Sequence, residues 1–151
     1  GGRMHVRRTV RQLLQDKGTA VYTIAPDDTV FRALEVMAEH DVGALVVTDA
    51  GAVAGIFSER DYARKVILHG HASRELSVSA IMSREVVTVA PEQTVSDCMR
   101  LMTDRRVRHL PVLDAGRLGG LVSIGDVVKA VMSEQEFLIE QLQAYVSGEL
   151  R

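Results

Sequence analysis

The sequence has few of the features that mark secreted, membrane-spanning or nucleic-acid-binding proteins. It contains one cysteine, Cys98, so no internal disulfide can form and a reducing compartment is favoured. Its apolar runs, of which "ALVV" at 44–47 is typical, are far shorter than the roughly 20 residues that span a bilayer. The formal net charge of −2 gives no general attraction to nucleic acid or to anionic lipid. We therefore expect a cytoplasmic protein without a membrane partner, and the charge disfavours a nucleic-acid partner.

The common motifs of catalytic sites are also missing. The sequence has no GxxxxGK(S/T) phosphate loop, no GxGxxG after a strand, no HExxH and no GxSxG. His69 and His71 flank one glycine, but no cysteine or acidic residue stands near them at a spacing suited to a metal. A solvated helix end explains these histidines better. We therefore expect no enzymatic activity, no catalytic cofactor and no metal site.

What the sequence does have is an internal duplication. Residues 21–66 align with residues 86–131 without a gap, and 17 of the 46 positions are identical. The segments before the two copies also correspond, "TVRQLL" at 9–14 and "SVSAIM" at 77–82. Two copies are too few for a solenoid, which needs three or more repeats. We therefore expect two homologous halves that pack on each other about a pseudo-twofold axis.

Each copy predicts the same α/β order of elements. A short strand rich in β-branched residues, 21–24 or 86–89, precedes a proline and a set of helix-start residues. The apolar residues that follow recur at the spacing of one helix face. They are Val30, Ala33, Leu34 and Met37 in the first copy, and Val95, Cys98, Met99 and Met102 in the second. Thr94 and Asp97 add a capping-box pattern to the start of the second of these helices.

Two further strands and a helix complete each copy. The second strand is "ALVVT" or "HLPVL", the turn is "DAG" in both copies, and the third strand ends at Ser58 or Ser123. The last helix carries residues 62–68 in the first copy and 127–132 in the second. A copy of about 60 residues is marginal as a free-standing domain, so the two halves should share an apolar interface.

The order of these elements and three motifs resemble those of tandem cystathionine-β-synthase (CBS) domains. With h for an apolar residue, the motifs are hxhxPxxT at the first strand, hPVhD at the second strand of the second copy, and GhhSxxD at the last strand of both. The resemblance covers about four fifths of the chain, residues 9–132. It implies two tandem β-α-β-β-α repeats in a disc-like module with two clefts between them. Members of this family bind adenosine-containing ligands in such clefts and regulate an attached or partner protein.

The resemblance also implies how the chain is divided. We expect an N-terminal tail at 1–8, CBS repeats at 9–70 and 71–132, and a separate amphipathic helix at 133–151, which opens with Ser133 and Glu136 as a capping box. Disc-like CBS pairs commonly dimerise through their helices, and an apolar-faced terminal helix adds surface that a small module cannot bury alone. We therefore expect a homodimer.

The repeated serine and aspartate have two interpretations that do not exclude each other. Ser58 with Asp61, and Ser123 with Asp126, have the spacing of a capping box, a purely structural role. A carboxylate at a helix start can also accept two hydrogen bonds from the cis-diol of a ribose. The resemblance gives both aspartates that role and places both serines near ribose or phosphate.

Each cleft takes residues from both copies. The resemblance assigns base contacts, made largely through the backbone, to residues 20–22 and 85–87, and phosphate contacts to Arg108 and His109. Arg60 points to the same cleft as Asp61. The first cleft therefore contains Ser58, Arg60, Asp61, Glu85, Val86, Val87, Arg108 and His109. The second contains Ala20, Val21, Tyr22, Gly43, Ala44, Ser123, Gly125 and Asp126.

Glycine and alanine stand in the second cleft where the first has cations, so we expect the two clefts to be unequal, with phosphate held better in the first. The expected function is that of a sensor whose clefts bind AMP, ADP, ATP or NAD and which regulates an unknown partner protein. Two alternatives remain open from the sequence. One is an interaction subunit with vestigial clefts, and the other is a nucleic-acid-binding module, against which the acidic balance and the three scattered tyrosines argue.

Overall fold

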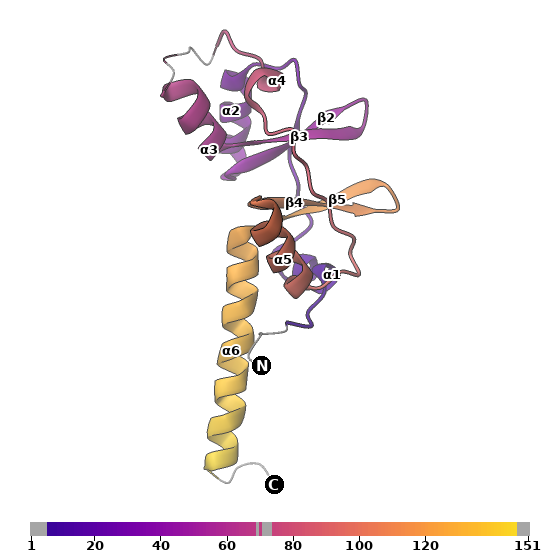
Figure 1. Ribbon diagram of the computed structural model, residues 1–151, viewed down its shortest axis with the longest axis vertical. Helices are drawn as coiled ribbons and strands as arrows, with labels where there is room; N and C mark the ends of the chain where they lie inside the picture. The colour runs from indigo at the N-terminus through magenta and orange to yellow at the C-terminus, as the bar shows by residue number, and fades with distance from the viewer. Residues whose placement is uncertain (1–5, 69, 71–73, 148–151) are drawn as a thin grey trace.

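The computed structural model describes residues 6–68, 70 and 74–147, so His69 and His71 lie outside the described residues. The elements in chain order are α1 (Val10–Lys17), β1 (Thr23–Ile24), α2 (Val30–His40), β2 (Ala44–Asp49), β3 (Ala52–Ser58), α3 (Glu59–Asp61), the π-helical segment η1 (Tyr62–Ile67), α4 (Val78–Ile81), α5 (Val95–Arg105), β4 (His109–Asp114), β5 (Arg117–Ser123) and α6 (Ile124–Val146). Figure 1 shows two small α/β halves stacked along the long axis, with α6 running away from them. Two tandem repeats of mixed α/β structure are as predicted. In the part of the chain that is described, no helix is both long and apolar enough to cross a membrane.

The first half is built on a three-stranded sheet with the order β1-β2-β3. β1 lies parallel to β2, and β2 pairs antiparallel with β3 from Ala44 opposite Ser58 to Asp49 opposite Ala52. α2 covers this sheet because its apolar stripe is buried, with Val30 and Met37 among its core residues. The helix begins at Thr29, whose hydroxyl accepts the N–H of the third residue on. The predicted strand at 21–24 is confirmed only for its last two residues.

The second half repeats this arrangement with a smaller sheet. β4 and β5 pair antiparallel from His109 opposite Ser123, and α5 begins with the predicted capping box of Thr94 and Asp97. The predicted strand at 86–89 is wrong in extent, because only Val89 pairs, as an isolated parallel bridge to Val112. Val89 donates to the Pro111 carbonyl at 3.0 Å and accepts from the Leu113 N–H at 2.9 Å. The β-branched residues before it favour extended backbone, but the segment meets β4 only at this end.

The last helix of each copy differs from the prediction in length. In the first half the helix that begins at α3 continues as η1 and ends at Ile67. In the second half α6 is one continuous helix of 23 residues. The expectation that Ser133 opens a separate helix is therefore wrong, since Ser133 lies in the interior of α6. The physical reason is that neither glycine nor proline interrupts 126–146, so nothing ends the first helix before the capping-box pattern is reached.

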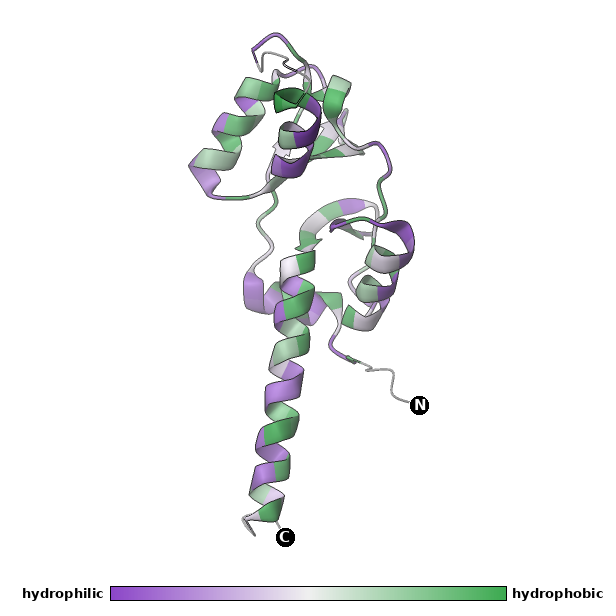
Figure 2. Ribbon diagram, turned by 60° about the vertical axis from the view of Figure 1, so that its left-hand side comes forward, coloured by the Kyte–Doolittle hydropathy of each residue, from purple (hydrophilic) through white to green (hydrophobic). Residues whose placement is uncertain are grey.

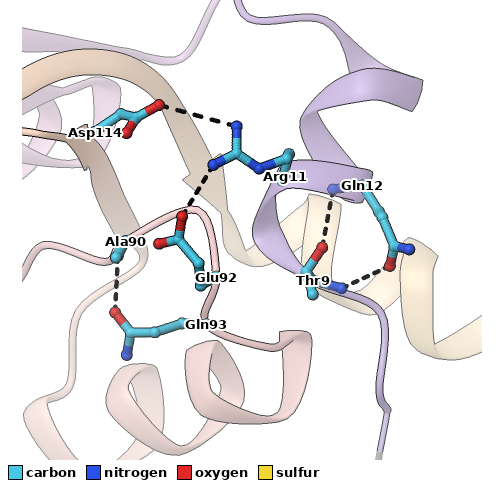
Figure 3. A network of polar contacts seen from close by, with 7 residues as sticks. All are labelled: Thr9, Arg11, Gln12, Ala90, Glu92, Gln93 and Asp114. Carbon is cyan, nitrogen blue, oxygen red and sulfur yellow. Dashed lines mark hydrogen bonds and ion pairs between the residues drawn. The ribbon is translucent and has the colours of Figure 1, made fainter.

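The two segments that precede the copies are exchanged between the halves. α1 packs on the second half, where Val10, Leu13 and Leu14 belong to the core that contains Cys98 and Val122. The N–H groups of Val10 and Arg11 donate to carbonyls of the loop before α5, at 2.8 and 2.9 Å. Figure 3 shows the Arg11 side chain reaching that loop and the end of β4, with Glu92 at 2.9 Å and Asp114 at 3.9 Å.

α4 makes the reciprocal contact with the first half. Val78 and Ile81 are buried in the same core as Phe57. The N–H of Val78 donates to the Asp28 carbonyl at 2.8 Å, and Ser83 forms an isolated bridge with Ile56 of β3. The exchange ties the halves together at two places along the chain.

The two halves also share an apolar interface, as the small size of each copy requires. Ala44, Val46 and Ile56 of the first sheet form a buried cluster against which Leu118 and Leu121 of β5 pack. This interface fixes the distance between the two sheets, and therefore the width of the space in which a ligand could lie.

Candidate functional site

A cavity of about 660 Å³ lies where α3 and β3 of the first half face β4 and the start of α6 of the second. The two halves meet at this level in Figure 1. Both halves contribute to its walls. The lining residues are Ile56, Ser58, Arg60, Asp61, Arg64, Ser83, Glu85, Met102, Arg106, Val107, Arg108, His109 and Ile124. Six of the eight residues that the sequence assigned to the first cleft are therefore brought together here.

The carboxylate in this cavity is held by the start of α3. Asp61 Oδ2 accepts the Ser58 N–H at 3.1 Å and lies 3.0 Å from Ser58 Oγ, while Ser58 Oγ accepts the Asp61 N–H at 3.2 Å. The structural interpretation of this pair, a capping box, is thus confirmed. The side chain of Asp61 is 15% exposed, and its Oδ1 lies 3.3 Å from Nζ of Lys65. The capping box orients the carboxylate toward the cavity and leaves Oδ1 to face other groups.

Positive charge gathers around this carboxylate from both halves. Four arginines line the cavity: Arg60, Arg64, Arg106 and Arg108. Desolvation and the positive charges of Arg108 and Arg64 lower the pKa of Arg60, which shows that the guanidinium groups lie close enough to repel one another. Within the described residues, Arg60, Arg106 and Arg108 form no ion pair with a carboxylate. Such a cluster is a ready site for an anion.

Arg106 was not predicted from the sequence. It caps the C-terminal end of α5 in the left-handed conformation, with φ 53°, and this turn directs the following residues into the cavity. The signal that could have found it is the contrast between the copies, since "RRVRH" at 105–109 stands where the first copy has "HDVGA".

His109 lies close to both repeated aspartates. Burial lowers its pKa below the ordinary 6.5, the carboxylates of Asp61 and Asp126 oppose that shift, and the positive charges of Lys17 and Arg108 add to it. The net result is a side chain that is neutral near pH 7 and able to donate one hydrogen bond and accept another. His109 lines the first cavity, and the carboxylates of both repeated aspartates act on it.

The residues predicted to contact an adenine base are placed unevenly. Glu85 lines the cavity, together with Ser83, which was not predicted. Val86 is half-buried and is not among the lining residues, whereas Val87 is buried in the core of the second half. An apolar wall is instead supplied by three residues outside the predicted set, Ile56, Met102 and Ile124.

The residues of the second predicted cleft surround the interface between the halves. Val21 and Ala44 belong to its apolar cluster, and the Tyr22 ring stacks on His40 at 3.8 Å between ring centroids. The Gly43 carbonyl accepts the Glu59 N–H at 3.0 Å. The equivalent hydrogen bond in the other copy runs from the Ile124 N–H to the Arg108 carbonyl at 2.9 Å. Ala20 and Gly125 are exposed.

Asp126 has a partner that the sequence did not reveal. It forms the capping box with Ser123, whose N–H it accepts at 2.8 Å, and its Oδ2 also lies 2.7 Å from Nζ of Lys17 at the end of α1. Burial raises the pKa of Asp126, but the hydrogen bonds from Lys17 and from the Ser123 N–H outweigh it and lower the pKa below its ordinary value. The fold therefore brings a cation to this cleft from a distant segment, which the residues at positions 43, 44 and 125 did not indicate.

Comparison with known proteins agrees with this architecture. The family model described as "CBS domain" matches residues 10–68 and 78–133. The chain is a CBS domain pair. It is 43% identical over 149 residues to "CBS domain-containing protein CBSX3, mitochondrial" of Arabidopsis thaliana, an alignment that spans 93% of this chain and 72% of the relative.

Solved CBS proteins have the same fold. A putative signal-transduction protein with CBS domains from Burkholderia ambifaria MC40-6 superposes with a TM-score of 0.78 at 49% identity, over 84% of this chain and 96% of that one. The CBS domain pair of protein MJ0100, solved with 5′-methylthioadenosine and S-adenosyl-L-methionine, superposes with a TM-score of 0.69 at 21% identity, over 80% of this chain and 97% of that one. The predicted fold and family are thus confirmed.

Proposed function

We propose that this CBS domain pair is an adenosine-nucleotide-binding regulatory module whose main site is the cavity around Asp61. The observation that carries the proposal is the meeting of one largely buried carboxylate and four arginines, from both halves, in one cavity of about 660 Å³. That volume lies within the range of small-molecule sites. A ribose diol needs a carboxylate acceptor and a phosphate needs cations, and this cavity supplies both.

Each group has a role in the proposed complex. Asp61 Oδ1 accepts from the ribose hydroxyls, and Arg60, Arg106 and Arg108 take the phosphate. The base lies against the apolar wall and the backbone of 85–87. The likeness to MJ0100 extends to the fold alone, so the ligand class is argued from these residues. The four arginines favour AMP, ADP, ATP or NAD over an adenosine ligand without phosphate.

A second, weaker nucleotide site is proposed at Asp126. Its remaining residues are Ala20, Val21, Tyr22, Gly43, Ala44, Ser123 and Gly125. The small side chains at 43, 44 and 125 leave no arginine where the first cleft has Arg60 and Arg108. Phosphate should therefore contribute less to binding here.

Titration calorimetry with AMP on three variants tests the main site. Asp61→Asn and Arg108→Ala should each weaken binding by roughly tenfold to a hundredfold, since a charge-assisted hydrogen bond contributes about 1.5–3 kcal/mol. Asp104→Asn removes an exposed carboxylate outside the cavity and should bind AMP like the unaltered protein. If Asp61→Asn keeps full affinity, or if GMP binds as well as AMP, the proposed site is wrong.

We also propose that the module assembles as a homodimer through α6. Along the exposed side of this helix, apolar residues follow a spacing of four and three in turn, which is the heptad pattern of a coiled-coil seam. The seam residues are Val128, Met132, Gln135, Ile139, Leu142 and Val146, and the five apolar ones are 51–83% exposed. Figure 2 shows that apolar and polar residues alternate along the whole of this helix.

A second copy is the occupant that this seam fits best. A seam with a 3.5-residue period packs against another helix of the same period. Its only polar member, Gln135, is uncharged, so the seams of two copies bring no like charges together. The seam continues toward the body into a groove of about 300 Å³ between α5 and α6, lined by Met99 and Val131 among others. An isologous contact of this kind closes after two subunits.

Sedimentation equilibrium separates the outcomes for assembly. The unaltered chain should sediment near twice its 16.5 kDa mass at tens of micromolar, and Leu142→Glu, which puts a charge into the seam, should sediment as a monomer. Gln141→Glu adds the same charge outside the seam and should leave the dimer intact. A monomer for the unaltered chain, or a dimer for Leu142→Glu, contradicts the proposal.

The proposal gives the chain a regulatory and not a catalytic role. Among the described residues of the cavity, the Ser58 hydroxyl is engaged in its capping box, which suits a structural role rather than nucleophilic attack. A location in the cytoplasm stays a prediction. The Arabidopsis relative carries the word "mitochondrial" in its name.

A further inference from the structure

The two repeated aspartates meet different cations. Lys17 Nζ lies 2.7 Å from Asp126 Oδ2 and 2.7 Å from the Leu121 carbonyl, so it binds two acceptors of the second half at once. The side chains of Lys17 and Asp126 are only 32% and 21% exposed. Asp61 faces Lys65 at a longer 3.3 Å, and that lysine is 45% exposed. Lys65 Nζ also donates to the Ile81 carbonyl at 3.0 Å, so each aspartate faces a lysine, and the contact at Asp126 is the shorter of the two.

The position of Lys17 is fixed by the helix that carries it and not only by the conformation of its own side chain. It is the last residue of α1, which is anchored to the second half by buried Leu13 and Leu14. Gly18 follows it with φ +101°, a conformation that turns the chain away directly after the helix. Lys17 thus lies next to Asp126 because α1, which precedes the first copy, packs on the second half.

The duplication makes this lysine a difference between the clefts. In the register that pairs residues 9–14 with residues 77–82, Lys17 corresponds to Glu85, an acidic residue that lines the first cavity. The segment before the second copy therefore delivers no cation to Asp61, while the segment before the first copy delivers one to Asp126.

We propose that Lys17 is a built-in competitor for the ribose-binding carboxylate of the second cleft, and so determines that the first cleft binds nucleotide more tightly. The inference rests on the proposed function, because it assumes that the aspartates accept from a ribose diol. The Lys17 ammonium attracts the Asp126 carboxylate as an opposite charge, which neutral ribose hydroxyls do not, so the hydroxyls displace the ammonium only at a cost in affinity. Nucleotide reaches Asp126 when Lys17 moves away.

Calorimetry in a background with both Asp61→Asn and Arg108→Ala makes binding at the second cleft measurable, because the two changes together remove the main carboxylate and one proposed phosphate ligand of the first cleft. Adenosine and AMP are titrated into this variant, into the same variant with Lys17→Met, and into the same variant with Lys129→Met, which removes an exposed lysine of α6. With Lys17→Met, binding of both ligands should strengthen by roughly tenfold. With Lys129→Met it should not change. Lys17→Gln, which keeps a polar side chain, should strengthen binding in the same direction.

The outcomes separate the competitor from its alternatives. If AMP binds less well after Lys17→Met while adenosine is unaffected, Lys17 is a phosphate ligand and the inference is overturned. Unchanged binding of both ligands, or no binding by the Lys17→Met variant at millimolar AMP, also overturns it. Failure of the main site is recognised separately: the unaltered protein then shows no tight AMP binding, or Asp61→Asn does not weaken that binding.

Discussion

Leu14 of α1 packs directly on Gly120 of β5, at a place where a Cβ on the glycine would lie 2.8 Å from Leu14 Cδ2. Gly55, the corresponding residue of the first copy, faces α4 in the same way, with Met82 Sδ and the Ser83 carbonyl oxygen each 2.8 Å from such a Cβ. The repeated glycine of the last strand thus admits the exchanged segment in both halves. It has a packing role that is independent of ligand binding.

Alanine at these two glycines should destabilise the fold to different degrees. Gly55→Ala meets backbone that cannot move away, and we expect a loss of about 2–3 kcal/mol in the free energy of unfolding. Gly120→Ala meets the end of a leucine side chain, which can adopt another rotamer, and we expect about 1 kcal/mol. Urea denaturation of both variants measures the difference. Equal losses would show that the two contacts are equally rigid.

Cys98 should be inert in the native state. Its side chain is fully buried in the core of the second half, and burial together with the nearby charge of Asp97 raises the pKa of the thiol to about 11. The reactive thiolate is therefore scarce at pH 8. Iodoacetamide should label the unfolded protein at least a hundredfold faster than the folded one, as followed by mass spectrometry. Rapid labelling under native conditions would mean that this core opens readily.

His109 should make stability depend on pH near neutrality. Its pKa in the folded state is lowered from 6.5, so the unfolded state binds a proton more readily. The stability it contributes is present above pH 6.5 and is lost as the pH falls through its folded pKa. His109→Gln should flatten the change in the free energy of unfolding between pH 7 and pH 5. Parallel curves for the two proteins would contradict the assignment.

The contact between Lys17 and Asp126 should stabilise the fold only where the carboxylate is ionised. The folded-state pKa of Asp126 is lowered from 3.8, so this contribution is present above pH 3.8 and is lost as the pH falls through the folded pKa. At pH 7 we expect Lys17→Met to lower the free energy of unfolding by about 1 kcal/mol, and at pH 2.5 by much less. Lys129→Met serves as the charge-matched control. A loss that does not vary with pH would point to packing of the lysine stem instead.

Much of the fold could be predicted because its signals are local. The capping boxes at Ser58 and Ser123 depend on residues three positions apart, and the buried stripe of α2 depends on a spacing within a few turns. The duplication tests each such signal twice. Boundaries were less certain, as the continuous α6 shows, because the Ser133 pattern is also compatible with a helix interior when nothing breaks the chain before it.

The sequence by itself determined the two homologous halves, the order of elements in each, the family, and six of the residues that line the first cavity. Tertiary structure alone decided which half each preceding segment packs on. α1 and α4 have similar apolar patterns. Such a pattern indicates that one face of the helix is buried, but it does not indicate which of the two cores that face packs on. Packing of Leu14 on Gly120 settles that choice, and it carries Lys17 to an aspartate 109 positions away. A contact over that separation leaves no periodic trace in the sequence, because it depends on how the halves are docked.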